Sequence, residues 1–276
     1  MPELPEVELI SRSLNTLVRG RTISSARLIR QRLAPDITPD GFASALQNTR
    51  INFVHRRGKH ILFDLSGGKT LIVHLRMSGR FSLLKAESED PKFTHAVFHL
   101  SGDERLVFDD QRHFGLMKIV STPELSEAKE LKKLAPEPFS DEFSPEYLRM
   151  ALKTSKRSLK EFLLDQTKVT GLGNIYAAEA MFAAGLHPER LACEVSARKI
   201  PLLYESIRAV LKMALSHAGN QAVDPENLEG GYFSGSGESW MVYDRENEPC
   251  RNCKTPILRL KQAGRSTYFC RKCQRR

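Results

Sequence analysis

The sequence predicts a multidomain α+β protein: an antiparallel β-sandwich with an N-terminal helix, then a helical domain, then a small metal-binding hairpin. Short apolar runs separated by glycine-containing turns fill residues 22–120. Apolar residues at helical spacing dominate residues 145–216. Two Cys-x2-Cys pairs lie close to the end of the chain. The predicted divisions are 1–120 (sandwich), 121–144 (connection), 145–240 (helical domain) and 241–276 (hairpin).

The N-terminal helix is predicted from Val7, Ile10, Leu14 and Leu17, which are spaced as one face of a helix after a proline-rich start. In the β-domain, residues 66–69 (Ser-Gly-Gly-Lys) and 101–104 (Ser-Gly-Asp-Glu) are typical of hairpin turns. Strands joined by such turns are antiparallel, which favours a sandwich over a parallel sheet.

The helical domain is expected to contain at least three helices. The first run carries a stripe of apolar residues: Leu148, Leu152, Leu159, Phe162 and Leu163. Further helical runs are predicted at 175–184 and 196–216. Residues 220–239 are glycine-rich and are predicted to be an irregular loop.

The charge of the chain indicates an acidic partner, nucleic acid first. Formal net charge is +9 and the pI is about 9.4. Ten Lys/Arg and two Glu lie between Arg245 and Arg276, so the C-terminal hairpin carries nearly all of this excess. No apolar run approaches the ~18 residues of a membrane span. Five cysteines in 276 residues are not a disulfide framework, so we expect a cytoplasmic, nucleoid-associated protein if the source is bacterial.

The strongest metal pattern is formed by Cys250, Cys253, Cys270 and Cys273. Two Cys-x2-Cys pairs sixteen residues apart are typical of a tetrahedral zinc site. Four protein ligands leave no open position, so one structural Zn²⁺ is expected. The intervening residues predict a hairpin with Arg265 at or just after its turn, where a guanidinium could bind phosphate in a bidentate manner.

The N-terminus carries a candidate nucleophile. Removal of Met1 would leave Pro2 with a secondary α-amine, which titrates near pH ~8 and is partly unprotonated at neutral pH. Such an amine can attack a sugar carbon and form an iminium. Glu3, next to it, could move the protons.

A second candidate site is the turn Thr170-Gly-Leu-Gly-Asn174, which lies between two helical patterns. Glycines before a helix start expose backbone amides, and a helix N-terminus attracts anions. The turn suits one DNA phosphate.

Together, the Pro2-Glu3 start, the 170–174 turn and the four-cysteine end resemble the formamidopyrimidine-DNA glycosylases of bacterial base-excision repair. Four further segments extend the likeness: 56–59 (Arg-Arg-Gly-Lys), 74–79 (His-Leu-Arg-Met-Ser-Gly), 110–115 (Asp-Gln-Arg-His-Phe-Gly) and 163–166 (Leu-Leu-Asp-Gln). Leu4 stands where the sister enzyme endonuclease VIII usually has glycine.

The resemblance implies a helix–two-turn–helix in the helical domain and double-stranded damaged DNA bound across a cleft between the lobes by a monomer. It implies a bifunctional glycosylase/AP lyase acting on 8-oxoguanine and formamidopyrimidines. Pro2 would attack C1′, Glu3 would be the acid/base partner, Lys59 would donate a proton in β-elimination, and Arg265 would assist δ-elimination.

The same resemblance assigns DNA-contacting positions to His95, Arg112 and Asn174. Met77, Arg112 and Phe114 would fill the gap left by the extruded base. A family lysine aligns on Ser155, so we expect its phosphate contact to come from Lys156 or Lys160.

Two other interpretations stay open. The first is an endonuclease VIII-like glycosylase for oxidised pyrimidines, because residues 220–241 depart from the family wording. The second is a non-catalytic binder of damaged DNA, which retention of Met1 would favour because an acylated Pro2 nitrogen cannot attack.

Overall fold

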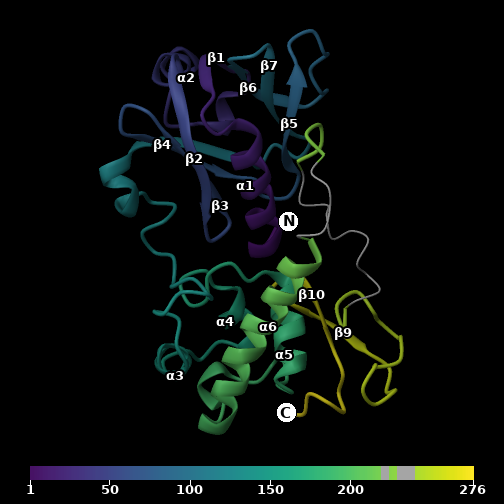
Figure 1. Cartoon of the computed structure of the whole chain (residues 1–276). Helices are drawn as coiled ribbons and strands as arrows, with labels where there is room; N and C mark the ends of the chain where they lie inside the picture. Colours follow the sequence, from purple (N-terminus) through teal and green to yellow (C-terminus); the bar gives the residue numbers. More distant parts are fainter. Residues whose placement is uncertain (219–223, 229–239) are drawn as a thin grey trace. The chain divides into compact units, whose positions relative to one another are not determined.

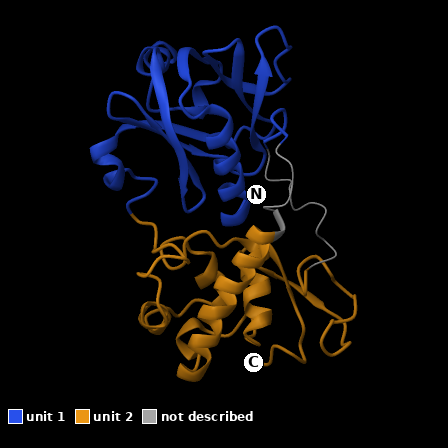
Figure 2. Ribbon diagram, viewed as in Figure 1, with its two compact units in different colours: residues 1–132, 218–232 blue, residues 133–217, 233–276 orange. Residues whose placement is uncertain are grey.

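The chain divides into two units in the computed structural model, which describes residues 1–218, 224–228 and 240–276 (Figure 2). Unit 1 comprises residues 1–132 and 218–232, and unit 2 comprises residues 133–217 and 233–276. The sequence-based division placed 218–232 in the helical domain. Within that range, residues 224–228 hydrogen-bond to a strand of the sandwich.

Unit 1 begins with α1 (Leu4–Val18), the predicted N-terminal helix (Figure 1). Glu3 and Glu6 form a reciprocal capping box at its start, and Pro5 lies in its first turn. Capping satisfies backbone N–H groups that have no partner within the helix. The apolar face of the helix is buried. The cap fixes its first residue at Leu4, so Pro2 and Glu3 lie at its N-terminal end.

Eight antiparallel strands make up the sheet of unit 1. They are β1 (Thr22–Leu28), β2 (Thr49–Arg57), β3 (His60–Leu65), β4 (Lys69–His74), β5 (Gly79–Lys85), β6 (Thr94–Leu100), β7 (Glu104–Asp110) and β8 (Leu116–Ser121). The order is β5-β7-β6-β1-β2-β3-β4-β8. The β1–β2 ladder is short, with Thr22 opposite Arg50 and Ile23 opposite Thr49, so the sheet folds into the two layers of the predicted sandwich.

Both predicted hairpin turns are confirmed. β3 and β4 are joined through Gly67 and Gly68, and β6 and β7 through Gly102 and Asp103, all with positive φ. Glycine adopts this conformation without the steric strain of a side chain. One helix was not predicted: α2 (Pro39–Leu46), whose Thr38 cap accepts a hydrogen bond from Gly41. It lies within a region that the pattern of apolar runs assigned to strands.

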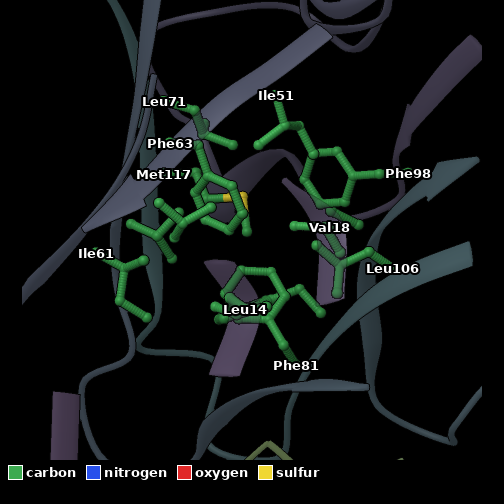
Figure 3. Packing of buried hydrophobic residues seen from close by; sticks show 14 of the residues in the cluster. Leu14, Val18, Ile51, Ile61, Phe63, Leu71, Phe81, Phe98, Leu106 and Met117 are labelled. Atoms are coloured by element: carbon green, nitrogen blue, oxygen red, sulfur yellow. The ribbon is translucent and has the colours of Figure 1, made fainter. Parts of the chain in front are cut away.

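The core of unit 1 lies between the two layers. Leu14 and Val18 of α1 meet Phe63 of one layer and Phe98 of the other in a single buried cluster (Figure 3). The described residues of this cluster come from positions 7–117, with one exception, Leu228. This core holds the two layers of the sandwich together and supports the turns of unit 1 in which candidate site residues lie.

Unit 2 contains α3 (Pro145–Lys153), α4 (Leu159–Leu164), α5 (Asn174–Ala183) and α6 (Ile200–Ala218). Short 3-10 turns occur in both units: η1 (Gln31–Leu33) and η2 (Thr122–Glu127) in unit 1, and η3 (Ala192–Glu194) and η4 (Ala197–Lys199) in unit 2. The predicted apolar stripe is buried throughout, from Leu148 to Leu163. The third predicted helix begins four residues later than expected, after η4.

The C-terminal hairpin consists of β9 (Leu258–Gln262) and β10 (Arg265–Phe269), joined by Ala263 and Gly264 at positive φ. Its base packs on α5: Ala178 and Phe182 share a buried cluster with Ile257 and Tyr268. Of the predicted irregular loop at 220–239, only 224–228 lies within the described residues. No helix in the described part of the chain is long and apolar enough to cross a bilayer.

Candidate nucleic-acid repair site

Pro2 and Glu3 lie at the N-terminal tip of α1. Pro2 is half-buried, Glu3 is buried, and Met1 in front of them is 50 % exposed. The Glu3 amide donates to Glu6 Oε2 over 2.7 Å. Glu6 therefore has a structural role and fixes the backbone that follows Pro2.

Lys59 lies in the tight turn between β2 and β3, after Gly58 at positive φ. Its side chain is only 5 % exposed. His60 and His74 lie nearby with their rings edge to face at 4.7 Å. Burial lowers the pKa of His60 to about 4 and that of His74 to about 2, so both rings are neutral at physiological pH. Lys59 is therefore held in the turn rather than extended into solvent as a mobile surface charge.

Met77 and Phe114 are large apolar residues left exposed, by 46 % and 43 %. Met77 belongs to the turn before β5, and Phe114 to the turn between β7 and β8. Gly79 pairs with Asp110 across β5 and β7, which brings the two turns together. The Arg112 guanidinium lies over the Phe114 ring, 5.2 Å from its centroid. We call Met77, Arg112 and Phe114 the wedge cluster.

Asp110 holds the wedge cluster in place. Its side chain is fully buried and accepts hydrogen bonds from the Ser78 hydroxyl and from the amides of Arg112 and Gly115. The Ser78 hydroxyl also accepts from the Arg112 amide over 3.0 Å. Burial favours the neutral acid, but these hydrogen bonds outweigh it and hold the pKa of Asp110 below its usual range. One carboxylate thus ties both turns together.

His95 is 3 % exposed, and its Nε2 lies 2.8 Å from Nδ1 of His113. Burial lowers the pKa of His95. The structure therefore places this predicted DNA-contacting residue behind His113. His113 has positive φ and lies between Arg112 and Phe114 in the turn that joins β7 and β8.

In unit 2, the turn between α4 and α5 is organised by Gln166. Its amide nitrogen donates to the carbonyls of Leu164 and Leu172, and its oxygen accepts from the Gly171 amide. Gly171 has positive φ, which glycine allows. Gln166 thereby shapes the segment that leads into the N-terminus of α5.

Asn174 is the first residue of α5. Its Nδ2 donates to the Ser266 carbonyl over 3.0 Å and so joins α5 to the hairpin, while Oδ1 is buried without a hydrogen-bond partner. Lys160 is 1 % exposed, and its ammonium donates to the Asn174 carbonyl. Of the two lysines expected to contact phosphate, Lys160 therefore supports the turn from behind, whereas Lys156 is exposed.

The four predicted metal ligands come together. The sulfurs of Cys250, Cys253, Cys270 and Cys273 lie within 4.8 Å of one another, with 3.9 Å between Cys250 and Cys273 and 3.4 Å between Cys253 and Cys270. Tetrahedral zinc with Zn–S bonds of ~2.3 Å requires separations of about 3.8 Å. Hydrogen bonds from Thr255 lower the pKa of Cys253 to about 6, and burial raises that of Cys270. This donor set fits a structural metal.

Arg265 is the first residue of β10, directly after the hairpin turn, and is exposed. The position agrees with the sequence-based expectation. The fifth cysteine, Cys193, is exposed and lies outside the metal cluster.

Sequence reasoning missed three residues that shape the site. Asp110 and Gln166 were noticed only as letters of motifs. Glu179 on α5 was not noticed: it is 3 % exposed and accepts the amides of Met241, Val242 and Tyr243, each at 2.9 Å. A lone acidic residue in the otherwise apolar α5 was the available signal.

A β-sandwich with Pro2 and Glu3 at the start of its first helix, a glycine turn leading into α5 and a four-cysteine hairpin are together typical of a class of DNA glycosylases. Three family models match consecutive parts of the chain: the formamidopyrimidine-DNA glycosylase N-terminal domain at residues 1–117, its H2TH domain at 134–224, and the zinc finger found in FPG and IleRS at 247–276.

Relatives agree over the full length. The chain is 41 % identical over 294 residues to a formamidopyrimidine-DNA glycosylase of Ruegeria pomeroyi, and 41 % identical over 279 residues to one of Desulforamulus reducens, covering at least 99 % of each protein. Among solved structures, Lactococcus lactis Fpg bound to DNA containing N7-benzyl-Fapy-dG matches at a TM-score of 0.91 and 32 % identity. The same protein bound to DNA containing an oxidised pyrimidine matches at 0.90 and 32 %. Both matches cover 100 % of each chain.

The chain belongs to the formamidopyrimidine-DNA glycosylase family. It is a DNA-repair glycosylase and AP lyase with a zinc-finger-type hairpin.

Proposed function

We propose that this enzyme excises oxidised purines, namely 8-oxoguanine and formamidopyrimidines, from double-stranded DNA and then cuts the abasic strand by β- and δ-elimination. The observation that carries the proposal is the wedge cluster. Two exposed apolar side chains and a cation are held rigidly by a buried carboxylate, which suits insertion into a base stack from which a nucleotide has been extruded.

The chemistry would start at Pro2 once Met1 has been removed. The amine attacks C1′ and the damaged base leaves. Opening of the sugar ring then gives an iminium that acidifies the C2′ proton. Loss of that proton expels the 3′ phosphate, and a second elimination expels the 5′ phosphate. Glu3 lies next to Pro2 at the capped start of α1 and would transfer protons in these steps.

Lys59 would donate the proton in β-elimination. Its burial in a tight turn supports this role, because a buried ammonium is held in one position and partly desolvated. Arg265 would assist δ-elimination from the hairpin tip. The four thiolates would hold one structural Zn²⁺, which stiffens the base of the hairpin that carries Arg265.

DNA contacts are proposed for Arg112, Asn174, His95 and Lys156. Exposure favours Arg112 and Lys156 as direct phosphate or base contacts. The N-terminus of α5, with Asn174 as its first residue, would accommodate a phosphate through its backbone amides.

The decisive test is borohydride trapping on a duplex containing 8-oxoguanine, followed by digestion and mass spectrometry of the adduct. We expect the DNA to be attached to the peptide beginning at Pro2. Attachment to a peptide containing Lys59 would refute the assignment of the nucleophile. A protein that binds but is never trapped, with Met1 retained, would identify a non-catalytic binder.

A second candidate substrate is oxidised pyrimidine. The L. lactis Fpg structure with oxidised-pyrimidine DNA favours considering it, since this chain shares that fold at 32 % identity. Relative single-turnover rates on 8-oxoguanine and thymine glycol duplexes decide between the two preferences.

A further inference from the structure

Residues 224–228 form an extra edge segment on the sheet of unit 1. β5 lies at one end of the sheet, with β7 on one side. On its other side the Leu228 amide donates to the Phe81 carbonyl over 2.8 Å, and the Leu83 amide donates to the Pro225 carbonyl over 2.7 Å. Leu228 is fully buried in the core of unit 1, 145 positions or more from Leu83 and Phe81 along the chain. We call residues 224–228 the β5 latch.

The latch has a defined shape of its own. The Glu226 amide donates to Asp224 Oδ1 over 3.0 Å, and the Asn227 amide donates to the Asp224 carbonyl. Asp224, Pro225 and Glu226 are exposed. The turn therefore holds Asp224, Pro225 and Glu226 outward, leaves Asn227 half-buried and directs Leu228 into the core.

Phe81, the backbone partner of Leu228, contacts Phe108 edge to face with 5.1 Å between ring centroids. Figure 3 shows Phe81 within the buried cluster. The Phe108 ring in turn touches Gly79 and Gly115. Gly79 follows the turn that carries Met77, and Gly115 follows Phe114 in the turn between β7 and β8. A Cβ added to Gly79 would lie 2.7 Å from Phe108 Cζ, and one added to Gly115 would lie 2.8 Å from the same atom.

A continuous set of contacts thus leads from Leu228 through Phe81 and Phe108 to the backbone next to Met77 and Phe114. A strand that is paired on one side only is easier to displace than a strand that is paired on both sides. Side chains that enter a base stack must be held firmly by their support. We propose that the β5 latch positions the wedge cluster and that Leu228 is its positioning residue, an inference that rests on the proposed function.

The test compares Leu228→Ala with Leu46→Ala. Leu46 is also fully buried in the same core, but it lies on α2, outside the set of contacts that supports the wedge. Single-turnover rates are measured on a duplex containing 8-oxoguanine and on a duplex with a preformed abasic site, where no base has to leave the stack. We expect Leu228→Ala to release the base about tenfold more slowly than Leu46→Ala, with abasic-site cutting equal within about threefold. Leu228→Met, which conserves volume, should restore base release.

Equal effects of the two alanine variants on both substrates would overturn the proposal, because Leu228 would then be an ordinary core residue. A wild-type protein that cuts neither substrate would instead refute the proposed function. A measurement on the unmodified protein covers the case in which Leu228→Ala does not fold. The amides of Leu83 and Leu228 should exchange with solvent as slowly as those of the central strands, and rapid exchange at both would show that the latch does not hold.

Discussion

At the scale of single residues, several candidate site residues have unusual burial: ionisable side chains are buried and apolar side chains are exposed. Lys59, Asp110 and Lys160 are ionisable and buried, whereas Met77 and Phe114 are apolar and exposed. Buried charges are retained only where hydrogen bonds or nearby charges stabilise them. Phe114 contacts the Arg112 guanidinium, and under the proposed function the exposed apolar pair would meet the base stack of bound DNA.

The Asp110 carboxylate should be essential for the wedge cluster. Asp110→Asn keeps the shape but removes the charge and turns an amide group toward backbone N–H donors. Leaving buried donors unsatisfied should lower the free energy of unfolding by about 1–3 kcal/mol, as measured by urea denaturation. Base excision should fall more than cutting of a preformed abasic site.

Asp141→Asn is the control for Asp110→Asn, because Asp141 is exposed. It should change neither stability nor rate. If Asp110→Asn matched this control, the wedge turns would be held by other contacts.

Lys59→Met retains the buried stem of the side chain and removes the ammonium. We expect strand cutting at an abasic site to slow by about 10²–10⁴-fold, the usual contribution of a positioned general acid. Base release, followed separately by chromatography, should be affected less. The exposed Lys85→Met is the matched control, and equal rates in both variants would remove Lys59 from the mechanism.

At the scale of elements, two short structures are too small to be rigid by themselves. The α4–α5 turn relies on Gln166, and the β9–β10 hairpin relies on its four cysteines and on Asn174. Segments of this size rarely bury enough apolar surface to stay folded without a cross-link or metal. Asn174 and Arg265, the candidate DNA-binding and catalytic residues in these segments, are therefore positioned by a few polar contacts and by the cysteine cluster.

Removing the metal should disable the hairpin before it affects the sandwich. We expect one zinc per chain by elemental analysis. A strong chelator, or Cys253→Ser, should abolish DNA binding measured by fluorescence anisotropy. Amide exchange in β3 and β4 should stay slow. Cys193→Ser, at the exposed cysteine outside the cluster, should behave as wild type; full DNA affinity after verified metal loss would contradict the role of the hairpin.

At the scale of the whole molecule, each unit has a buried core and carries some of the candidate site residues. The sandwich carries Pro2, Lys59 and the wedge cluster, and the helical unit carries Asn174 and Arg265. The stability of unit 1 should also depend on pH, because His60 and His74 are buried and neutral.

The folded-state pKa values of these histidines, about 4 and about 2, lie below the ordinary value of 6.5. Between these values the unfolded chain binds protons that the folded protein does not, so stability is complete above pH 6.5 and falls as the pH drops toward 4. Each histidine should contribute a slope of roughly 1.4 kcal/mol per pH unit. Urea denaturation of His60→Gln between pH 7 and pH 4.5 should show a shallower decline than wild type or His99→Gln, and parallel declines would contradict this.

The sequence was sufficient for features that depend on neighbours in the chain. The apolar face of α1, the glycine turns at 67–68 and 102–103, the apolar stripe of unit 2 and the four cysteines all act over a few residues, and each was located correctly, although α1 begins at Leu4, three residues before the predicted Val7. The helix α2 was missed, because its eight residues show too little periodicity to stand out between strands.

The sequence located the four metal ligands by their spacing, and its joint motifs, through their resemblance to a family, pointed to that family and to the candidate catalytic residues, because these depend on which chemical groups the chain contains and in what order. Tertiary structure decided which of these groups are buried and which are exposed. In the folded chain Lys160 donates a hydrogen bond to the Asn174 carbonyl, and Asp110 connects two turns that are distant in sequence. Leu228 pairs with β5. These outcomes depend on contacts between residues far apart in sequence. Such contacts form, and contribute to stability, only once the chain has folded.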